Sequence, residues 1–247
     1  MQEVFERNSV LAKLCQELII NGNDKGILIR ALGSVGFYLK LQKHYKLYSY
    51  YRKPLGDIDI IIRKDNVFKL EGFFNELGFT ENNNFKMLFG YQRRVYNTSN
   101  GITIEVYLDD LYLCQKIVIQ ERIYLDNPTL CYTDLFLSKI QRVNLTLKDI
   151  FDLTLLLDNI SIVNKDPEGL NILYLQKLCA KDWHWWKTLN TNLLNLLEQP
   201  NIKFINHVKL KMKINTILNG INSNKKSLKW HIRNILGDKI RWYDHIE

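Results

Sequence analysis

Residues 56–62 read Gly-Asp-Ile-Asp-Ile-Ile-Ile, and the predicted fold follows from this stretch. In an extended strand successive side chains alternate between faces, so Asp57 and Asp59 share one face and Ile58 and Ile60 pack on the other. Two carboxylates this close repel each other unless a cation lies between them, and Mg²⁺ is the simplest cation that prefers such oxygen ligands. On these residues alone a solvent-exposed turn before a buried strand remains an alternative.

The sequence before this strand predicts a phosphate-binding turn. Residues 27–39 have the pattern of a short apolar strand, a turn of small residues and the beginning of a helix. Gly33 allows the backbone to approach a ligand closely, and Ser34 offers a hydroxyl group and suits a helix N-cap. Because the N–H groups at a helix N-terminus favour phosphate, Gly33 and Ser34 are candidate nucleotide-binding residues.

A third carboxylate follows in a second predicted strand. Residues 100–108 begin with an Asn-Gly turn and continue as a strand that carries Glu105, and residues 87–96 predict the strand before the turn. The two strands are expected to form a hairpin. Arg93 and Arg94 are adjacent in the first of them and so lie on opposite faces, which leaves one of them able to face a substrate. If the Glu105 strand neighbours the Asp-x-Asp strand, Glu105 becomes a third metal ligand.

These features resemble the DNA polymerase β-like nucleotidyltransferase superfamily over residues 25–110. The residues that carry the resemblance are Gly33, Ser34, Asp57, Asp59 and Glu105. Two departures are visible: the spacer between the Gly-Ser turn and the Asp-x-Asp motif is longer than usual, and the superfamily often has Asp where this chain has Glu. The longer third carboxylate raises the question of whether one or two metal ions bind.

The resemblance implies a reaction and a set of roles. It implies transfer of a nucleoside monophosphate from an NTP to a hydroxyl acceptor, with Mg²⁺ as the cofactor. Asp57, Asp59 and Glu105 are the expected catalytic, metal-binding residues. Gly33 and Ser34 are expected to bind the β- and γ-phosphates. Chemistry of this kind depends mainly on positioning and on neutralising the charge of the phosphates.

A second resemblance lies further along the chain. Residues 137–142 and 147–153 are similar to the Lys-x-x-Arg and Lys-Asp-x-x-Asp-Leu segments of the AbiE-type toxin and minimal-nucleotidyltransferase-like branch. The resemblance implies that Lys139 contacts nucleotide phosphates and that Asp152 belongs to the active site or braces it. Without this resemblance, Lys148 and Asp152, which are four residues apart, would be interpreted as an ion pair on a helix surface. For Asp152 the alternative to a place in the active site is a polar contact that clamps two domains together.

Arg52 is the last candidate nucleotide-binding residue. It lies in the aromatic and basic segment 48–54, and related sequences tend to have an arginine just before the Asp-x-Asp motif. Contact of Arg52 with phosphate and stacking of the tyrosines on a base form one interpretation. A solvent-exposed loop whose tyrosines cover the edge of the core is the other.

Composition indicates an ordinary globular protein. The chain has 247 residues, of which 46% are hydrophobic and 24% charged, enough for one large domain or two small ones. The sequence contains no run of 18 or more apolar residues, so we expect no transmembrane helix. The N-terminus lacks the pattern of a signal peptide. We therefore expect a cytoplasmic protein without a membrane partner. The four cysteines are scattered and read as small buried hydrophobic residues.

The predicted fold class is α+β. Residues 1–110 form the expected nucleotidyltransferase domain, with a small mixed sheet and helices over residues 8–21, 35–48 and 65–77. Residues 111–247 form the expected helical domain, a bundle with a basic C-terminal region. Its predicted helices cover residues 110–121, 131–143, 146–159, 169–180, 184–197, 202–219 and 226–237. Three tryptophans within residues 181–187 either stack on bases or fill a gap between helices.

The charge of the chain points to anionic partners. Residues 201–247 contain ten Lys and Arg against three Asp and Glu, a net +7 of the formal +8. Such a region favours a polyanion such as RNA, for instance a tRNA end, or an acidic protein such as an antitoxin. The alternative is that the helix exteriors are simply rich in lysine. Three functions follow: an active nucleotidyltransferase, a toxin that uses the same chemistry, or an inactive binding module that kept the fold.

Overall fold

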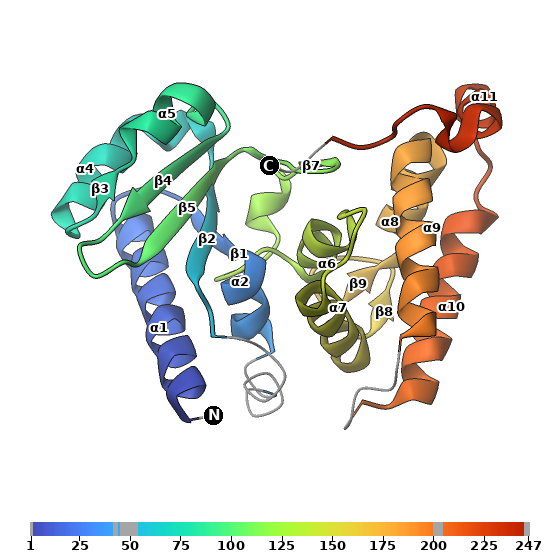
Figure 1. The fold of residues 1–247 in the computed structure, drawn as a ribbon, viewed down its shortest axis with the longest axis horizontal. Coiled ribbons are helices and arrows are strands. Elements are labelled where there is room, and N and C mark those ends of the chain that lie inside the picture. The colour runs from blue at the N-terminus through green and yellow to red at the C-terminus, as the bar shows by residue number, and fades with distance from the viewer. Residues whose placement is uncertain (1, 42–43, 45–53, 200–204, 245–247) are drawn as a thin grey trace. The chain divides into compact units, whose positions relative to one another are not determined.

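A computed structural model describes residues 2–41, 44, 54–199 and 205–244, and its contacts divide the chain into two compact units (Figure 1). The first, here called the sheet unit, comprises Met1–Tyr112 and Lys116–Cys131. The second, here called the helical unit, comprises Leu113–Gln115 and Tyr132–Glu247. The chain is therefore of the predicted α+β class.

The sheet unit contains a mixed five-stranded sheet in the order β1-β2-β5-β4-β3. Its strands are β1 (Ile29–Leu32), β2 (Asp57–Ile62), β3 (Thr80–Glu81), β4 (Arg93–Asn97) and β5 (Thr103–Leu108). β2 runs parallel to β5, and the other neighbouring pairs are antiparallel. The predicted hairpin is confirmed, because β4 and β5 pair antiparallel in register from Arg93–Tyr107 to Asn97–Thr103.

Helix α1 (Gln2–Asp24) covers part of this sheet and holds the chain where it enters β2. It contacts β1 and helix α2 (Gly33–Lys40), which begins directly after β1. The side chain of Asn8 accepts a hydrogen bond from the backbone N–H of Leu55 at 2.8 Å, and Nε of Arg7 donates to the carbonyl of Leu55 at 2.9 Å. Two side chains of α1 therefore fix the backbone immediately before the Asp-x-Asp motif.

The predicted helix over 65–77 appears as a 3₁₀ segment, η2 (Lys64–Lys69), followed by α4 (Leu70–Glu76). Phe74 of α4 stacks on Tyr96 of β4 with ring centroids 4.1 Å apart, which joins this helix to the sheet. The predicted strand over 87–96 is wrong in its first part, because residues Asn83–Phe89 form helix α5. The Asn82 side chain accepts a hydrogen bond from the N–H of Phe85, and this N-cap begins the helix.

The predicted helix over 110–121 is also wrong. The chain instead forms a hairpin of β6 (Asp110–Tyr112) and β7 (Lys116–Val118), followed by the 3₁₀ segment η3 (Arg122–Tyr124). The carboxylate of Asp110 accepts a hydrogen bond from the N–H of Ile119 at 3.0 Å, which closes the hairpin. Backbone bonds then join Ala31 of β1 to the carbonyl of Pro128 and to the N–H of Leu130. These bonds explain why the sheet unit extends to Cys131, past the boundary predicted after residue 110.

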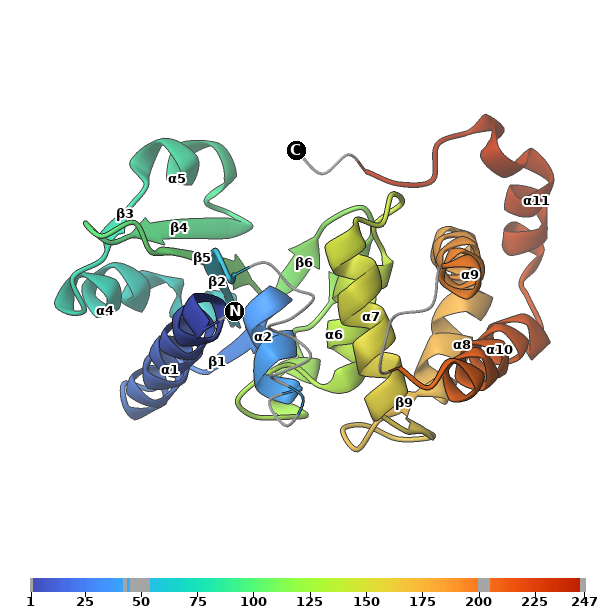
Figure 2. The ribbon, with the colours of Figure 1, turned by 60° about the horizontal axis from the view of Figure 1, so that its bottom comes forward.

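The helical unit follows the predicted pattern more closely. Its elements are α6 (Tyr132–Ile140), α7 (Leu147–Asn159), β8 (Ile162–Val163), β9 (Leu170–Asn171), α8 (Ile172–Lys181), α9 (Trp183–Glu198), α10 (His207–Ser223), α11 (Leu228–Leu236) and the 3₁₀ segment η4 (Gly237–Lys239). Figure 2 shows α8, α9 and α10 grouped together, and each contacts the other two. None of the helices in the described ranges is long and apolar enough to cross a bilayer.

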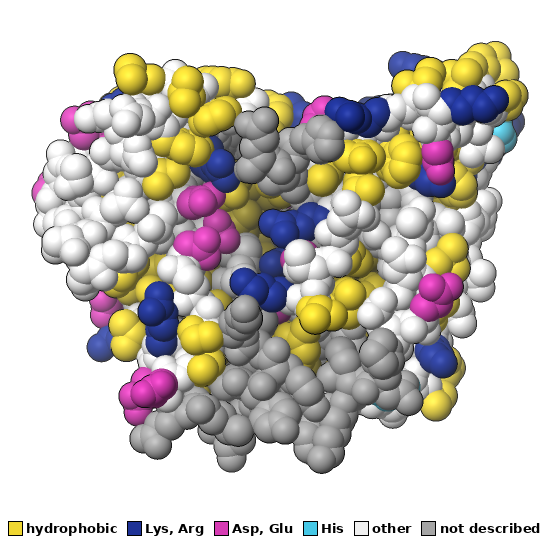
Figure 3. Space-filling model, in the orientation of Figure 1, with side chains coloured by type: hydrophobic (Ala, Val, Ile, Leu, Met, Phe, Trp, Pro, Cys, Tyr) yellow, Lys and Arg dark blue, Asp and Glu magenta, His cyan; other side chains and the backbone are white. Residues whose placement is uncertain are grey.

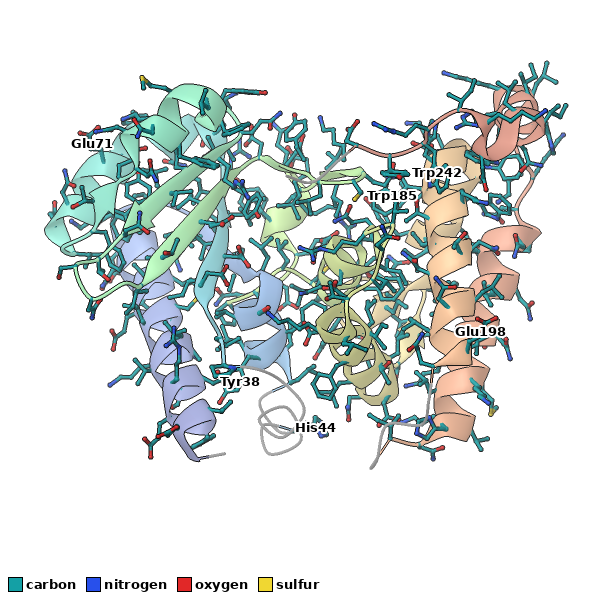
Figure 4. All side chains as sticks on the ribbon, viewed as in Figure 1. Tyr38, His44, Glu71, Trp185, Glu198 and Trp242 are labelled. Carbon is teal, nitrogen blue, oxygen red and sulfur yellow. The ribbon has the colours of Figure 1, made fainter. Side chains whose placement is uncertain are left out.

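The tryptophans mainly fill spaces between helices. Trp183, Trp185 and Trp230 are buried, and the ring centroids of Trp186 and Trp230 lie 4.9 Å apart across α9 and α11. Trp242 returns to the end of α9 that carries Trp185, as Figure 4 shows, and its Nε1 donates to Thr188. The packing interpretation of this segment therefore accounts for most of its rings. The four cysteines are buried, as the sequence predicts.

Candidate functional site

The Asp-x-Asp motif lies on β2 as the strand alternation predicts. Ile58 and Ile60 are fully buried on one side of the strand, whereas Asp57 and Asp59 are half-buried on the other. Figure 3 shows acidic side chains gathered on the surface over β2 and β5. The two aspartates therefore present their carboxylates at a partly solvated face of the sheet unit.

Glu105 lies beside them because β2 and β5 are parallel neighbours. In this pairing Asp59 is opposite Glu105, and Asp57 is opposite Thr103. Side chains at paired positions of adjacent strands share a face of the sheet, so all three carboxylates project from the same side. The sequence predicted this neighbourhood only on the condition that the two strands are adjacent, and the sheet order meets that condition.

Gly33 brings the backbone directly against Asp59. Its φ of +59° lies in the left-handed region that favours glycine, and a Cβ built on Gly33 would lie 1.8 Å from Oδ2 of Asp59. Only a residue without a side chain allows this approach. Leu32, the last residue of β1, is paired with Asp59 in the sheet, so the turn and the carboxylate are held together by strand register.

Helix α2 begins at Gly33, one residue before Ser34, the residue predicted to cap it. Leu32 occupies the N-cap position and its side chain has no hydrogen-bonding group, while Ser34 is the second residue of α2 and is half-buried. The prediction that Ser34 caps this helix is therefore wrong. The first turn of α2 nevertheless begins beside Asp59, and the free backbone N–H groups of a helix N-terminus are of the kind that bind phosphate.

Arg93 is the residue whose place in this site the sequence did not specify. Its Nη1 lies 2.8 Å from Oε2 of Glu105 and donates to the hydroxyl of Tyr107 at 3.3 Å. The guanidinium carbon also lies 4.8 Å from the ring centroid of Phe85 and 5.5 Å from that of Tyr107. The neighbouring Arg94 turns away and pairs with Glu81 at 3.0 Å. Of the two arginines, it is Arg93 that faces the carboxylates.

The electrostatics of the site keep Arg93 charged. Burial alone would lower the pKa of Arg93, but Tyr107 and Glu105, with a smaller contribution from Asp59, outweigh burial and raise the pKa above its ordinary value. Burial, followed by the charges of Asp59 and Glu105, raises the pKa of Tyr107. The phenol therefore keeps its proton, which it donates to Glu105 at 3.3 Å.

The donor atoms suit a hard cation, although their present arrangement does not enclose one. Asp57, Asp59 and Glu105 offer carboxylate oxygens of the type that Mg²⁺ binds, and Gly33 leaves room beside Asp59. Within the described residues, no group of three or more His, Cys, Asp or Glu side chains is placed to hold a metal ion. Glu105 is engaged by Arg93, and this ion pair competes with any use of its carboxylate as a ligand.

Lys139 and Asp152 meet each other inside the helical unit. Nζ of Lys139 lies 3.2 Å from Oδ1 of Asp149 and 3.2 Å from Oδ2 of Asp152, and both carboxylates are buried. Thr146 forms a capping box with Asp149 at the start of α7. Asp152 therefore pairs with Lys139 and not with the exposed Lys148, so the surface ion pair considered from spacing is not formed. The predicted contact of Lys139 with phosphate stays a prediction.

Burial and charge act in opposite directions on Asp149. Burial would raise the pKa of its carboxyl, but Lys139, the hydrogen bonds from Thr146 and the charge of Arg142 outweigh burial and hold the pKa below its ordinary value. The Lys139 cluster, by which we mean Lys139, Asp149 and Asp152, is thus a buried ion network that stabilises the junction of α6 and α7.

Arg52 and the tyrosines around it lie outside the described residues. In the basic C-terminal region, Lys209 and Lys213 donate to backbone carbonyls at the end of α7, and Arg233 donates to the carbonyls of Gly237 and Ile240. Part of the positive charge therefore serves the fold of the helical unit.

Comparison of the chain with protein-family models, with curated proteins and with solved structures found no match in any of the three. The functional interpretation of the site therefore depends on its own geometry and chemistry.

Proposed function

We propose that the protein is a Mg²⁺-dependent nucleotidyltransferase of the DNA polymerase β-like type, which transfers a nucleoside monophosphate from an NTP to a hydroxyl acceptor. The observation that carries the proposal is the contact between Gly33 and Asp59. A left-handed glycine at a helix N-terminus lies against the carboxylate of an Asp-x-Asp strand, with Glu105 opposite that carboxylate on the parallel neighbour. This arrangement brings phosphate-binding N–H groups and cation-binding oxygens to one place.

Each residue has a role in this proposal. Asp57 and Asp59 hold the cation, and Glu105 completes the ligand set when it is released from Arg93. Bound Mg²⁺ supplies charge neutralisation of the triphosphate. The backbone at Gly33 and the hydroxyl of Ser34 donate hydrogen bonds to the terminal phosphates. The acceptor oxygen forms its bond to the α-phosphorus as the bond to the β-phosphate oxygen breaks, so pyrophosphate leaves and the hydroxyl proton passes to solvent or to a carboxylate.

RNA is the acceptor that we would test first. The chain carries a formal charge of +8 at pH 7, and a positive surface attracts nucleic acid independently of sequence. A protein or small-molecule hydroxyl remains the alternative acceptor. A toxin that modifies RNA by the same chemistry and is held by an acidic antitoxin falls within the same proposal, because it needs the same site.

A second candidate function is nucleotide binding without transfer. The ion pair between Arg93 and Glu105 favours it, because a third carboxylate that stays bound to an arginine is not available as a metal ligand. In this case the sheet unit would bind an NTP through the Gly33 turn and the two aspartates. The two candidates differ in catalysis and agree on the binding site.

The decisive experiment measures binding and transfer together. The full chain is incubated with each NTP labelled at the α-phosphate, with Mg²⁺ or EDTA, and with total RNA, and NTP binding is measured by calorimetry. The variants are Asp57→Asn and Asp59→Asn. The matched control is Asp65→Asn, because Asp65 is an exposed aspartate of the same unit whose carboxylate bonds to the nearby Arg63 and Asn66.

Transfer of label by wild type and Asp65→Asn, lost in EDTA and in the two site variants, would support the transferase. Mg²⁺-dependent NTP binding without transfer to RNA, protein or added small-molecule hydroxyls would favour the binding module. Absence of both binding and transfer in wild type would overturn the proposal.

A further inference from the structure

Arg93 occupies an unusual position for a site that is proposed to bind a cation. Its guanidinium lies 2.8 Å from Glu105, the carboxylate that pairs with Asp59 across the parallel strands. It is packed between the rings of Phe85 and Tyr107, so its position does not depend on the ion pair alone. The side chain is 28% exposed, which leaves it within reach of solvent and of a ligand at the same face.

The charges around Arg93 explain why it is held there. Three carboxylates project from neighbouring positions on β2 and β5, and like charges this close destabilise one another unless a cation lies near them. Arg93 is a basic residue paired with this group, and its interaction with Asp59 adds to its ion pair with Glu105. The guanidinium thus does part of what a bound divalent cation would do.

We propose that Arg93 is a built-in counter-ion that competes with the divalent cation for Glu105. In the metal-free protein Arg93 offsets the charge of Glu105 and thereby part of the repulsion among the three carboxylates. When the cation binds, Glu105 exchanges its bond to Arg93 for a bond to the ion. The inference rests on the proposed function, because it assumes that the three carboxylates are the cation site. It goes further by naming the residue that limits metal affinity.

The proposal predicts that removing the charge of Arg93 raises the affinity for the metal ion, which the loss of a purely structural ion pair would not do. Replacing Arg93 by methionine keeps an unbranched apolar stem to pack between the two rings but removes the competing charge. Metal affinity should therefore rise, by about tenfold, the effect of one charge-assisted hydrogen bond that no longer has to be broken. Lysine at the same position retains the charge and should return the affinity towards that of wild type.

Arg94 provides a matched control. It is the adjacent arginine in the same strand, and it is also ion-paired to a glutamate. Its partner, Glu81, lies on β3 and is not one of the three carboxylates of the proposed cation site. Arg94→Met should lower stability to a comparable degree without changing metal affinity. Glu105→Gln tests the shared partner: it should weaken metal binding, and it should abolish most of the gain produced by Arg93→Met when the two are combined.

The test is a calorimetric titration of the full-length variants with Mn²⁺ and with Mg²⁺, in the absence of nucleotide. Circular dichroism and urea unfolding confirm that each variant is folded. The expected result is tighter binding by Arg93→Met, wild-type binding by Arg94→Met, near-wild-type binding by Arg93→Lys, and strong non-additivity between Arg93→Met and Glu105→Gln.

Two contrary results are distinguishable. Equal metal affinity in wild type and Arg93→Met would overturn the role of Arg93 and leave the proposed function intact. Absence of metal binding in every variant would overturn the proposed function, and the role of Arg93 with it. Binding by Arg93→Met alone would support the role of Arg93 in its strongest form, in which the wild-type arginine keeps the ion out.

Discussion

Asn8 and Leu55 are joined by a hydrogen bond of 2.8 Å from the backbone N–H of Leu55 to the side-chain oxygen of Asn8. Asn8 is fully buried on α1, and Leu55 stands two residues before Asp57. The helix at the N-terminus therefore fixes the backbone that enters the Asp-x-Asp strand. Its contribution to the site is positional, since it contacts the chain just before the carboxylates.

Replacing Asn8 by alanine should lower the free energy of unfolding by about 1–3 kcal/mol, because the buried N–H of Leu55 loses its acceptor. Urea unfolding measures the change. Asn23→Ala on the same helix is the control, since Asn23 is exposed. If the two substitutions lowered the free energy of unfolding by the same small amount, the hydrogen bond from Leu55 to Asn8 would not stabilise the chain before β2.

Gly33→Ala should lower the free energy of unfolding by more than an ordinary alanine substitution of a glycine in the left-handed region. Gly78 has a φ of +78° and, among the described atoms, nothing within 4 Å of an added Cβ, so Gly78→Ala measures the backbone strain alone, about 1–2 kcal/mol. Gly33→Ala adds a collision with the carboxylate of Asp59 and should also abolish Mg²⁺-dependent NTP binding. Urea unfolding and calorimetry measure the two effects. Equal losses of stability, with binding retained, would contradict the close approach.

Lys139→Met should destabilise the helical unit at neutral pH by about 3–5 kcal/mol, because it removes a cation that pairs with two buried carboxylates. The pKa of Asp149 is held below its ordinary value, so its stabilising contribution is present above the ordinary carboxyl pKa and is lost as the pH falls through the folded-state pKa. Without Lys139 the pKa of Asp149 should rise. The difference in stability between wild type and variant should therefore shrink as the pH is lowered from about 7 towards about 4.

Urea unfolding across this pH range tests the prediction for Lys139. Lys148→Met is the matched control, because Lys148 is exposed near the start of α7 and takes no part in the Lys139 cluster. A loss of stability that is small, or that does not vary with pH, would show that the cluster contributes little.

Lys213→Met should lower the free energy of unfolding by about 1–2 kcal/mol. Nζ of Lys213 donates to the carbonyl of Leu157 at 2.7 Å and also bonds to the carbonyl of Ile160, so it satisfies acceptors at the C-terminal end of α7. Lys211→Met is the control, since Lys211 is exposed on the same helix. Thermal unfolding of the two variants gives the comparison, and equal melting temperatures would contradict this capping role.

Part of the fold could be read from local pattern because the physical cause is local. The period of two in residues 57–60 places both aspartates on one face whatever the rest of the chain does. The Asn-Gly turn at residues 100–101 brings β4 and β5 together as a hairpin. Five of the predicted helices after residue 130 occur within a few residues of their expected bounds, since each buries an apolar stripe at helical spacing.

Other elements escaped prediction because short apolar segments suit either secondary structure. Residues 83–89 and 110–118 each contain too few residues for periodicity to decide between helix and strand. The Asn82 cap decides for a helix in the first case, and the Asp110 side chain closes a hairpin in the second. Both are side-chain hydrogen bonds that the pattern of apolar residues does not reveal.

The sequence by itself determined which side chains are available for chemistry: a pair of aspartates on one strand face, a Gly-Ser turn and a lone glutamate in a second strand. Only the tertiary structure decided their partners. The parallel register of β2 and β5 brings Glu105 to Asp59, and the hairpin register brings Arg93 to Glu105. Strand register and the closeness of Gly33 to Asp59 depend on contacts between residues far apart in the chain, which local periodicity does not encode.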